Sequence, residues 1–190
     1  LVTLTASPFA ARTQTWDVVS VTSSINTHFG SFVYSGSTGI ILNNHMDDFS
    51  SATHPNYFGM PPSRSNYVRP GRQPVSSMSP TIFLDENNKV KLVIGGAGGT
   101  RIITSVTMTA FRTLWMHQPL GQALNSPRLH HQLYPMELFH EEDFDTKLLE
   151  EFQKIGHQLQ PYSKRNSGVS AIYRDSQQAI IGCTDSRRVG

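Results

Sequence analysis

Four short stretches hold most of the residues that could do chemistry. They are TSSIN at 22–26, NNHMDDFS at 43–50, PGRQPVSSMSPT at 70–81 and GGAGGT at 95–100. The second stretch follows the apolar run GIIL and places two amides, a histidine and two adjacent carboxylates before Phe49. Carboxylates and amides can hold a charged ligand. A solvated loop can carry the same residues without such a role, so the neighbouring elements must decide between the two interpretations.

The glycine-rich stretch lies between a predicted strand and a predicted helix. Backbone N–H groups of such a loop can point at an anion or at a developing oxyanion. No Lys-Ser or Lys-Thr pair follows it, and the dinucleotide-binding spacing is incomplete. The pattern therefore predicts neither a phosphate loop nor a dinucleotide site, and a tight turn remains the alternative.

The histidines and the cysteine do not favour a metal centre. His130 and His131 are adjacent, no His-Glu-x-x-His pattern occurs, and Cys183 is the only cysteine. No Gly-x-Ser-x-Gly elbow supports a Ser-His-Asp triad. We therefore predict no metal and no cofactor.

Composition indicates one globular domain over residues 1–190. The chain is 37% hydrophobic, and its 16 basic and 14 acidic residues are dispersed, giving a net charge of +2. This distribution argues against a nucleic-acid partner. No apolar run approaches the roughly 18 residues of a membrane span, and no signal peptide or other targeting signal is recognised. The start at Leu1 suggests a processed product or a fragment.

The order of expected elements is typical of an α+β layered domain. Alternating or apolar runs predict strands, and an apolar spacing of three to four predicts two helices. The expected strands are 16–26, 39–43, 81–85, 89–96, 169–174 and 179–183.

The first expected helix follows the glycine loop, with Ile102, Ile103, Val106, Ala110, Leu114 and Trp115 as its apolar positions. The second spans about 142–155, with Phe144, Leu148, Phe152 and Ile155 on one stripe and Gly156 as its stop. Residues 50–80 carry six prolines, which predicts a long loop. Tyr57 or Phe58 in this loop could cover the pocket as a lid, or the loop could be packed by its own aromatic side chains.

Taken in order, several blocks resemble the small (light) subunit of γ-glutamyltransferase, also called glutathione hydrolase. They are TSSINTHFGS, GIILNNHMDDFS, PGRQPVSSMSPTI, GGAGGTRIITSV, PRLHHQL and TDSRR. The resemblance implies an N-terminal-nucleophile hydrolase with an αββα sandwich, of which this chain is the small-subunit half. It also implies a precursor that cleaves itself, which makes a threonine the N-terminal nucleophile.

The resemblance also implies the residues that hold the substrate. Asp48 corresponds to the aspartate that binds the α-ammonium group, and Asn26 to an asparagine at the same end of the substrate. Ser76 and Ser77 correspond to the serine pair that donates to the α-carboxylate. His45 stands where the family usually has Glu or Gln near the amine. A neutral His45 could accept a hydrogen bond, whereas a protonated one would repel an ammonium group.

The catalytic residues follow from the same resemblance. Gly98 and Gly99 correspond to the glycines whose N–H groups form the oxyanion hole, and Ser24 to a threonine whose hydroxyl supports the nucleophile. The family's small subunit begins Thr-x-His about twenty residues before the position of Asn26. Here the candidate is Thr5, which no histidine follows at the expected place, and segment 1–15 looks atypical.

Two functions are therefore open. The first is a γ-glutamyl hydrolase and transpeptidase that takes the γ-glutamyl group from glutathione and passes it to water, an amino acid or a dipeptide. In the family a large subunit completes the heterodimer and anchors it at the cell surface, so an extracellular location is expected. The second is an inactive light-chain-like homologue that acts as a binding or interaction protein.

Overall fold

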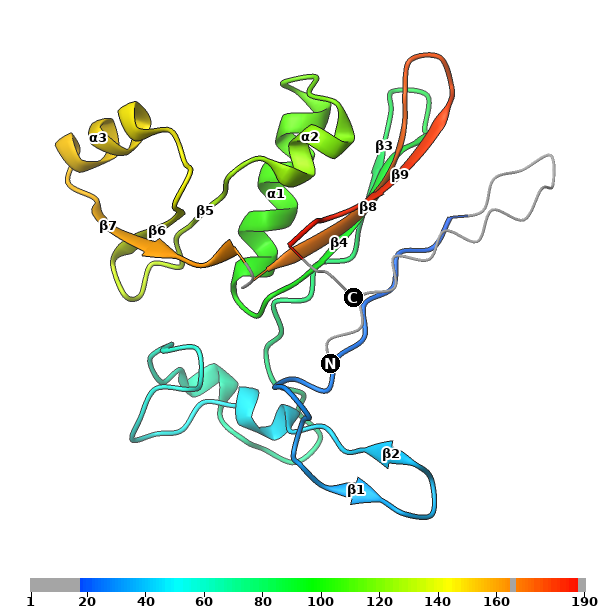
Figure 1. Ribbon diagram of the computed structural model, residues 1–190. Coiled ribbons are helices and arrows are strands. Elements are labelled where there is room, and N and C mark those ends of the chain that lie inside the picture. Colours follow the sequence, from blue (N-terminus) through cyan, green and yellow to red (C-terminus); the bar gives the residue numbers. More distant parts are fainter. Residues whose placement is uncertain (1–17, 165–166, 188–190) are drawn as a thin grey trace.

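The central sheet of the molecule is antiparallel and four-stranded (Figure 1). The computed structural model describes residues 18–164 and 167–187. The strand order is β3-β4-β8-β9, with β3 Thr81–Leu84, β4 Val90–Ala97, β8 Gly168–Arg174 and β9 Ile180–Thr184. The expected hairpin at 81–96 is confirmed. Of the two expected C-terminal strands, β8 pairs with β4, and β9 pairs with β8.

Two helices cover one face of this sheet. They are α1 Arg101–Leu114 and α2 Leu120–Asn125. The core lies between them and the sheet, and consists of Leu92, Ile94, Ile102, Val106, Ala110, Leu120, Leu124, Val169 and Ala171. The other face exposes apolar side chains near its edges, such as Ile82 at 41% and Ile180 at 50%. One apolar face is therefore covered and the opposite one is partly open.

A second, three-stranded sheet lies beside the helical layer. Its order is β5-β6-β7, with β5 Leu129–His130, β6 Glu137–Glu141 and β7 Gln158–Tyr162. Strands β6 and β7 run parallel and are connected through α3 Thr146–Lys154. The carboxylate of Asp145 caps this helix by accepting from the N–H groups of Lys147 and Leu148, and Gly156 follows its end with φ +102°.

Between residues 18 and 80 the structure contains only short elements. They are the hairpin β1 Tyr34–Ser35 with β2 Ile40–Ile41, and the 3-10 turns η1 His45–Asp48 and η2 Arg64–Asn66. Apart from η2, the proline-rich stretch 50–80 is irregular, as expected. Figure 1 shows this part of the chain gathered below the central sheet. No helix in the described ranges is long and apolar enough to cross a membrane.

Three expectations about elements were wrong. Residues 18–26 alternate in exposure but form no strand, because no described segment provides a hydrogen-bonded ladder for them. In α1 the expected apolar positions Ile103 and Trp115 are exposed. The helix α3 begins at residue 146 rather than 142, its buried residue is Leu149, and Leu148 and Ile155 are exposed.

Candidate functional site

One large cleft contains every predicted site residue that the structure describes. Its volume is about 1420 Å³, and its lining includes Ser24, Asn26, His45, Asp48, Ser76, Ser77, Gly98 and Gly99. These side chains come from four segments that are far apart in the sequence, and the fold brings them together. Thr5, the expected nucleophile, lies outside the described residues.

His45 links two of the segments. Its Nδ1 lies 2.9 Å from Asp48 Oδ2, and its Nε2 lies 3.1 Å from the carbonyl oxygen of Ser24. Both ring nitrogens therefore face oxygen atoms of the chain, and neither is left free to accept from a substrate. Asp48 is half-buried on η1, whereas its neighbour Asp47 is exposed.

A network of amides holds Asn26 beside η1. The Asn26 side chain donates to the carbonyl of Asn44 at 3.3 Å, and Asn44 Oδ1 accepts from the N–H and hydroxyl of Thr27 at 3.2 and 3.1 Å. Asn26 has a φ of +73°, a region that asparagine tolerates better than most residues. The Ser24 hydroxyl accepts from the N–H of Asn26 at 2.8 Å, so both predicted residues belong to one tight turn.

Asn66 is a residue that the sequence analysis missed. It is buried, and its Nδ2 donates to the carbonyl of Asp48 at 2.8 Å and to Ser50 Oγ at 3.2 Å. Its Oδ1 accepts from the N–H of Val75 at 3.0 Å, one residue before Ser76. One side chain thus connects the predicted ammonium receptor to the predicted carboxylate receptor. An asparagine in a proline-rich loop gives no signal of such a contact.

The two serines of the predicted pair line the cleft and differ in exposure. Ser76 is exposed and its hydroxyl accepts from the N–H of Met78 at 3.2 Å. Ser77 is half-buried, and its carbonyl accepts from the Ser79 hydroxyl at 3.0 Å. Within the described part of the chain the Ser77 hydroxyl has no hydrogen-bond partner, so it is available to a ligand.

The glycine loop turns the chain from β4 into α1. Gly98 and Gly99 have φ values of +139° and +60°, which residues with a side chain rarely adopt. A Cβ on Gly99 would lie 2.4 Å from Cε1 of Phe58, so the Phe58 ring lies directly against this glycine. Tyr57 and Phe58 also contact each other edge to face, with ring centroids 5.2 Å apart. Both rings line the cleft, and they also pack on each other.

A relay of side chains connects Phe58 to α1. Gln132 Nε2 donates to the carbonyl of Phe58 at 3.2 Å, and Gln132 Oε1 lies 2.9 Å from His130 Nε2. Nε2 must donate to this oxygen. His130 Nδ1 lies 2.9 Å from the hydroxyl of Thr104, which also lies 3.2 Å from the carbonyl oxygen of Arg101. Burial lowers the pKa of His130, while the bond to Gln132 opposes the shift and the charge of Arg101 adds to it.

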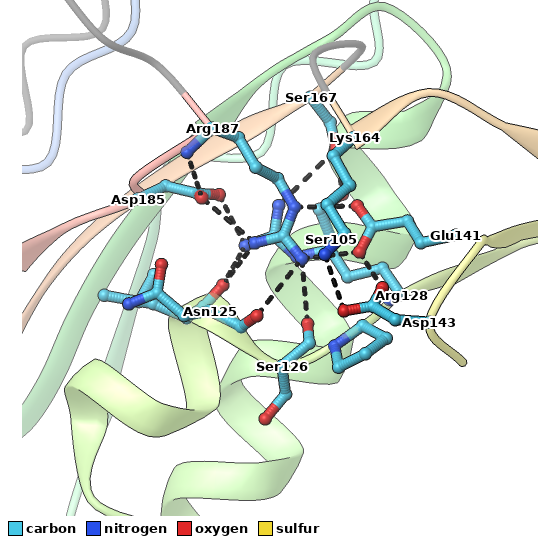
Figure 2. A network of polar contacts seen from close by, with 12 residues as sticks. Ser105, Asn125, Ser126, Arg128, Glu141, Asp143, Lys164, Ser167, Asp185 and Arg187 are labelled. Atoms are coloured by element: carbon cyan, nitrogen blue, oxygen red, sulfur yellow. Dashed lines mark hydrogen bonds and ion pairs between the residues drawn. The ribbon is translucent and has the colours of Figure 1, made fainter. Parts of the chain in front are cut away.

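Behind the cleft lies a buried set of four charges, which we call the ionic quartet (Figure 2). Arg128 pairs with Asp185 at 2.6 Å, and Arg187 pairs with Glu141 at 2.5 Å and with Asp185 at 3.0 Å. Burial alone would lower the pKa of Arg187, but hydrogen bonds and charges from Glu141 and Asp185 raise it instead. Burial, followed by the charge of Glu141, also raises the pKa of nearby Tyr162 to about 12.

The ionic quartet supports both ends of the glycine loop. Asp185 Oδ2 accepts from the N–H of Val169 at 3.2 Å, and Val169 pairs with Gly96 at the end of β4. At the α1 end of the loop, the Ser105 hydroxyl donates to Ser167 Oγ at 3.1 Å. The same Ser167 Oγ accepts from an Nη of Arg128 at 3.4 Å. No group of three metal-binding side chains occurs among the residues that the structure describes.

Comparison with known proteins places these features in a family. A family model described as "Gamma-glutamyltranspeptidase" matches residues 7–190. Scoloptoxin SSD20 of Scolopendra dehaani is 44% identical over 92% of this chain and 88% of its own length. Glutathione hydrolase proenzyme 1 of Schizosaccharomyces pombe is 40% identical over 90% of this chain.

Solved structures agree with the sequence comparison. A mutant γ-glutamyltranspeptidase from Helicobacter pylori aligns with a TM-score of 0.83 and 36% identity, over 90% of this chain and 94% of that chain. The enzyme from Pseudomonas nitroreducens complexed with L-DON aligns with a TM-score of 0.81 and 34% identity, over 92% and 91% of the two chains. The predicted fold, the small-subunit half of an N-terminal-nucleophile hydrolase sandwich, is thereby confirmed.

The match covers a limited part of some relatives. The chain spans 27% of the fission-yeast proenzyme and 30% of scoloptoxin SSD14, a further Scolopendra dehaani protein that is 43% identical.

Proposed function

Because this chain belongs to the gamma-glutamyltranspeptidase family, we propose that it forms the light-chain portion of a γ-glutamyl hydrolase and transpeptidase. Its substrates are glutathione and other γ-glutamyl compounds, and its acceptors are water, amino acids or dipeptides. The observation that carries this proposal is the single cleft that unites all the predicted substrate-binding residues.

The cleft offers complementary charges to the glutamyl end of such a substrate. The carboxylate of Asp48 is half-buried, and it is suited to an α-ammonium group because charge-assisted hydrogen bonds are about twice as strong as neutral ones. Ser76 and Ser77 provide hydroxyl donors for the α-carboxylate, and Asn26 lines the same cleft. His45 pairs with Asp48 and orients its carboxylate.

The proposed reaction proceeds through an acyl-enzyme. The hydroxyl of Thr5 attacks the carbonyl carbon of the γ-glutamyl amide, and the α-amine of the same residue takes the hydroxyl proton and passes it to the departing amine. Water or an acceptor amine then attacks the resulting ester and restores the hydroxyl. The Gly98–Gly99 loop supplies backbone N–H groups to the oxyanion, a contribution worth on the order of 100-fold in rate. The Ser24 hydroxyl supports the nucleophile.

A large subunit is the proposed partner. The open face of the central sheet exposes apolar side chains such as Ile82 and Ile180, and burying this surface in a heterodimer would stabilise the assembly. By the same family relationship, we propose that the complex acts outside the cell and is held at the surface through the large subunit.

The test of function begins with the N-terminus. The proposal requires a mature chain that starts at Thr5, because only then does this residue carry a free α-amine. N-terminal sequencing of the purified protein, combined with release of the anilide from a γ-glutamyl anilide, checks both points. Thr5→Ala should abolish turnover, whereas the neighbouring Thr3→Ala should still yield an active chain. A persistent Leu1 start without turnover would support the inactive homologue instead.

A matched pair of variants tests the proposed role of η1 in substrate binding. Asp48→Asn should raise KM for the γ-glutamyl donor by about 100-fold, since the ammonium loses its charged partner. Asp47→Asn, which changes the exposed neighbour, should leave KM within about twofold. Equal effects of the two substitutions would contradict the assignment of Asp48.

A further inference from the structure

Arg101 is the first residue of α1 and lines the same cleft as the glycine loop. Its guanidinium carbon lies 5.7 Å from the ring centroid of Phe139 and 5.1 Å from that of Tyr162. These two rings, from β6 and β7, fix the side chain in place. Stacking on aromatic faces leaves the edge of a guanidinium group free for in-plane hydrogen bonds.

The guanidinium has no acceptor. No hydrogen bond or ion pair of the Arg101 side chain is present in the described part of the chain, and its Nε is buried without a partner. Arg112, Arg128, Arg174 and Arg187 all donate to carbonyl or carboxylate oxygens. Buried donors are almost always satisfied in native proteins, so the missing acceptor indicates a ligand.

The buried carboxylates that the structure describes behind the cleft are not free for Arg101. Glu141 is occupied by the backbone of Arg128 and the side chain of Arg187, and Asp185 by both arginine side chains. A planar guanidinium with a free edge matches a carboxylate, which it binds with two parallel hydrogen bonds. The acceptor that fits Arg101 is therefore a carboxylate that does not belong to the described part of the chain.

We infer that Arg101 binds the C-terminal carboxylate of the peptide that leaves from, or accepts, the γ-glutamyl group. This inference rests on the proposed function, in which Ser76 and Ser77 already serve the carboxylate at the glutamyl end. Arg101 follows Gly99 by two residues, so their Cα atoms lie within about 7.6 Å of each other. An extended dipeptide spans about 7 Å, which brings its terminal carboxylate within reach of the Arg101 side chain when its amine is at the glycine loop.

Paired substrates test this assignment. The purified protein, with any chain that co-purifies, is assayed with a γ-glutamyl dipeptide and with the same compound carrying a C-terminal amide. The native protein should favour the free acid by about tenfold in kcat/KM, the effect of losing one charge-assisted pair. Arg101→Gln should remove this preference without changing kcat/KM for the amide, and Arg101→Lys should keep part of it. Arg64→Gln, on the exposed η2 turn, is the matched control.

A binding measurement separates this inference from the proposed function. Calorimetry should show that the protein binds the dipeptide cysteinylglycine about tenfold more tightly than its C-terminal amide, and that Arg101→Gln abolishes the difference. This result would support the carboxylate site even if no γ-glutamyl compound were turned over, which would overturn only the proposed function. Equal binding of the two dipeptides would overturn the inference. Equal losses on both substrates, together with weaker subunit association, would assign Arg101 to a carboxylate of the partner subunit instead.

Discussion

His45 Nδ1 lies 2.9 Å from Asp48 Oδ2, while His45 Nε2 lies 3.1 Å from the carbonyl oxygen of Ser24. An imidazolium ring can donate to both oxygens, whereas a neutral ring can donate to only one of them. Protonation therefore strengthens the contact between His45 and the carboxylate that we assign to the substrate ammonium. The imidazolium and the ammonium then compete for the same carboxylate.

We accordingly expect a permanent positive charge at position 45 to weaken donor binding. His45→Lys should raise KM for a γ-glutamyl donor several-fold, because the lysine ammonium competes with the substrate ammonium for Asp48. His45→Gln, which adds no charge, should raise KM less. His28 also lines the cleft, so His28→Lys serves as the control and should change KM less than His45→Lys. Equal KM values for His45→Lys and His45→Gln would contradict the assignment.

The amide of Asn66 should affect substrate binding more than the chemical step. Asn66→Asp keeps the oxygen that accepts from Val75 but loses the donors to Asp48 and Ser50. We expect KM for the donor to rise about tenfold, the effect of about 1.4 kcal/mol, with kcat within about twofold. Steady-state kinetics measure both quantities.

Asn87→Asp is the control for this substitution, because Asn87 is exposed in the turn between β3 and β4. It should leave both kinetic constants unchanged. A fall in kcat for Asn66→Asp at constant KM would place the effect at the glycine loop and refute a role at the glutamyl end.

The local elements were predictable because their signals are contained in short windows. The β3–β4 hairpin has alternating apolar strands around a polar turn, and α1 follows a glycine loop with apolar residues at helical spacing. The parallel pairing of β6 with β7 depends on contacts between distant segments, and β5 contains only two residues. Such elements leave almost no periodic pattern in the sequence.

The candidate site likewise contains residues that could be predicted and residues that could not. Asp48, Ser76 and Ser77 were predicted because their motifs resemble a family, and the fold places them in one cleft. Asn66 was missed because its function depends on a contact with Asp48, which lies 18 positions earlier in the sequence. The ionic quartet was missed as well, since charged residues are usually exposed and only the folded chain shows which of them are paired and buried.

Burial of His130 predicts a pH-dependent stability. Its pKa is lowered in the folded protein, so at acid pH the unfolded state binds the additional proton. The free energy of unfolding should therefore fall as pH decreases through about 6.5, by up to about 1.4 kcal/mol per pH unit until the folded protein is protonated too. Urea unfolding at pH 7.5 and pH 5.5 measures the change. His130→Gln should reduce the dependence, whereas His54→Gln, at an exposed position, should leave it as it is.

Removing one member of the ionic quartet should strongly lower the free energy of unfolding. Arg187→Gln leaves Glu141 buried without its charged partner, a change that typically costs about 3–5 kcal/mol. Lys154→Gln breaks an ion pair with Glu151 in which both side chains are 65% exposed, and it should cost no more than about 0.5 kcal/mol. Denaturant unfolding of the two variants measures the difference. Because the quartet supports both ends of the glycine loop, Arg187→Gln should also lower kcat at temperatures where the variant is still folded. A similar small cost for both substitutions would show that the buried charges are compensated by solvent or by rearrangement.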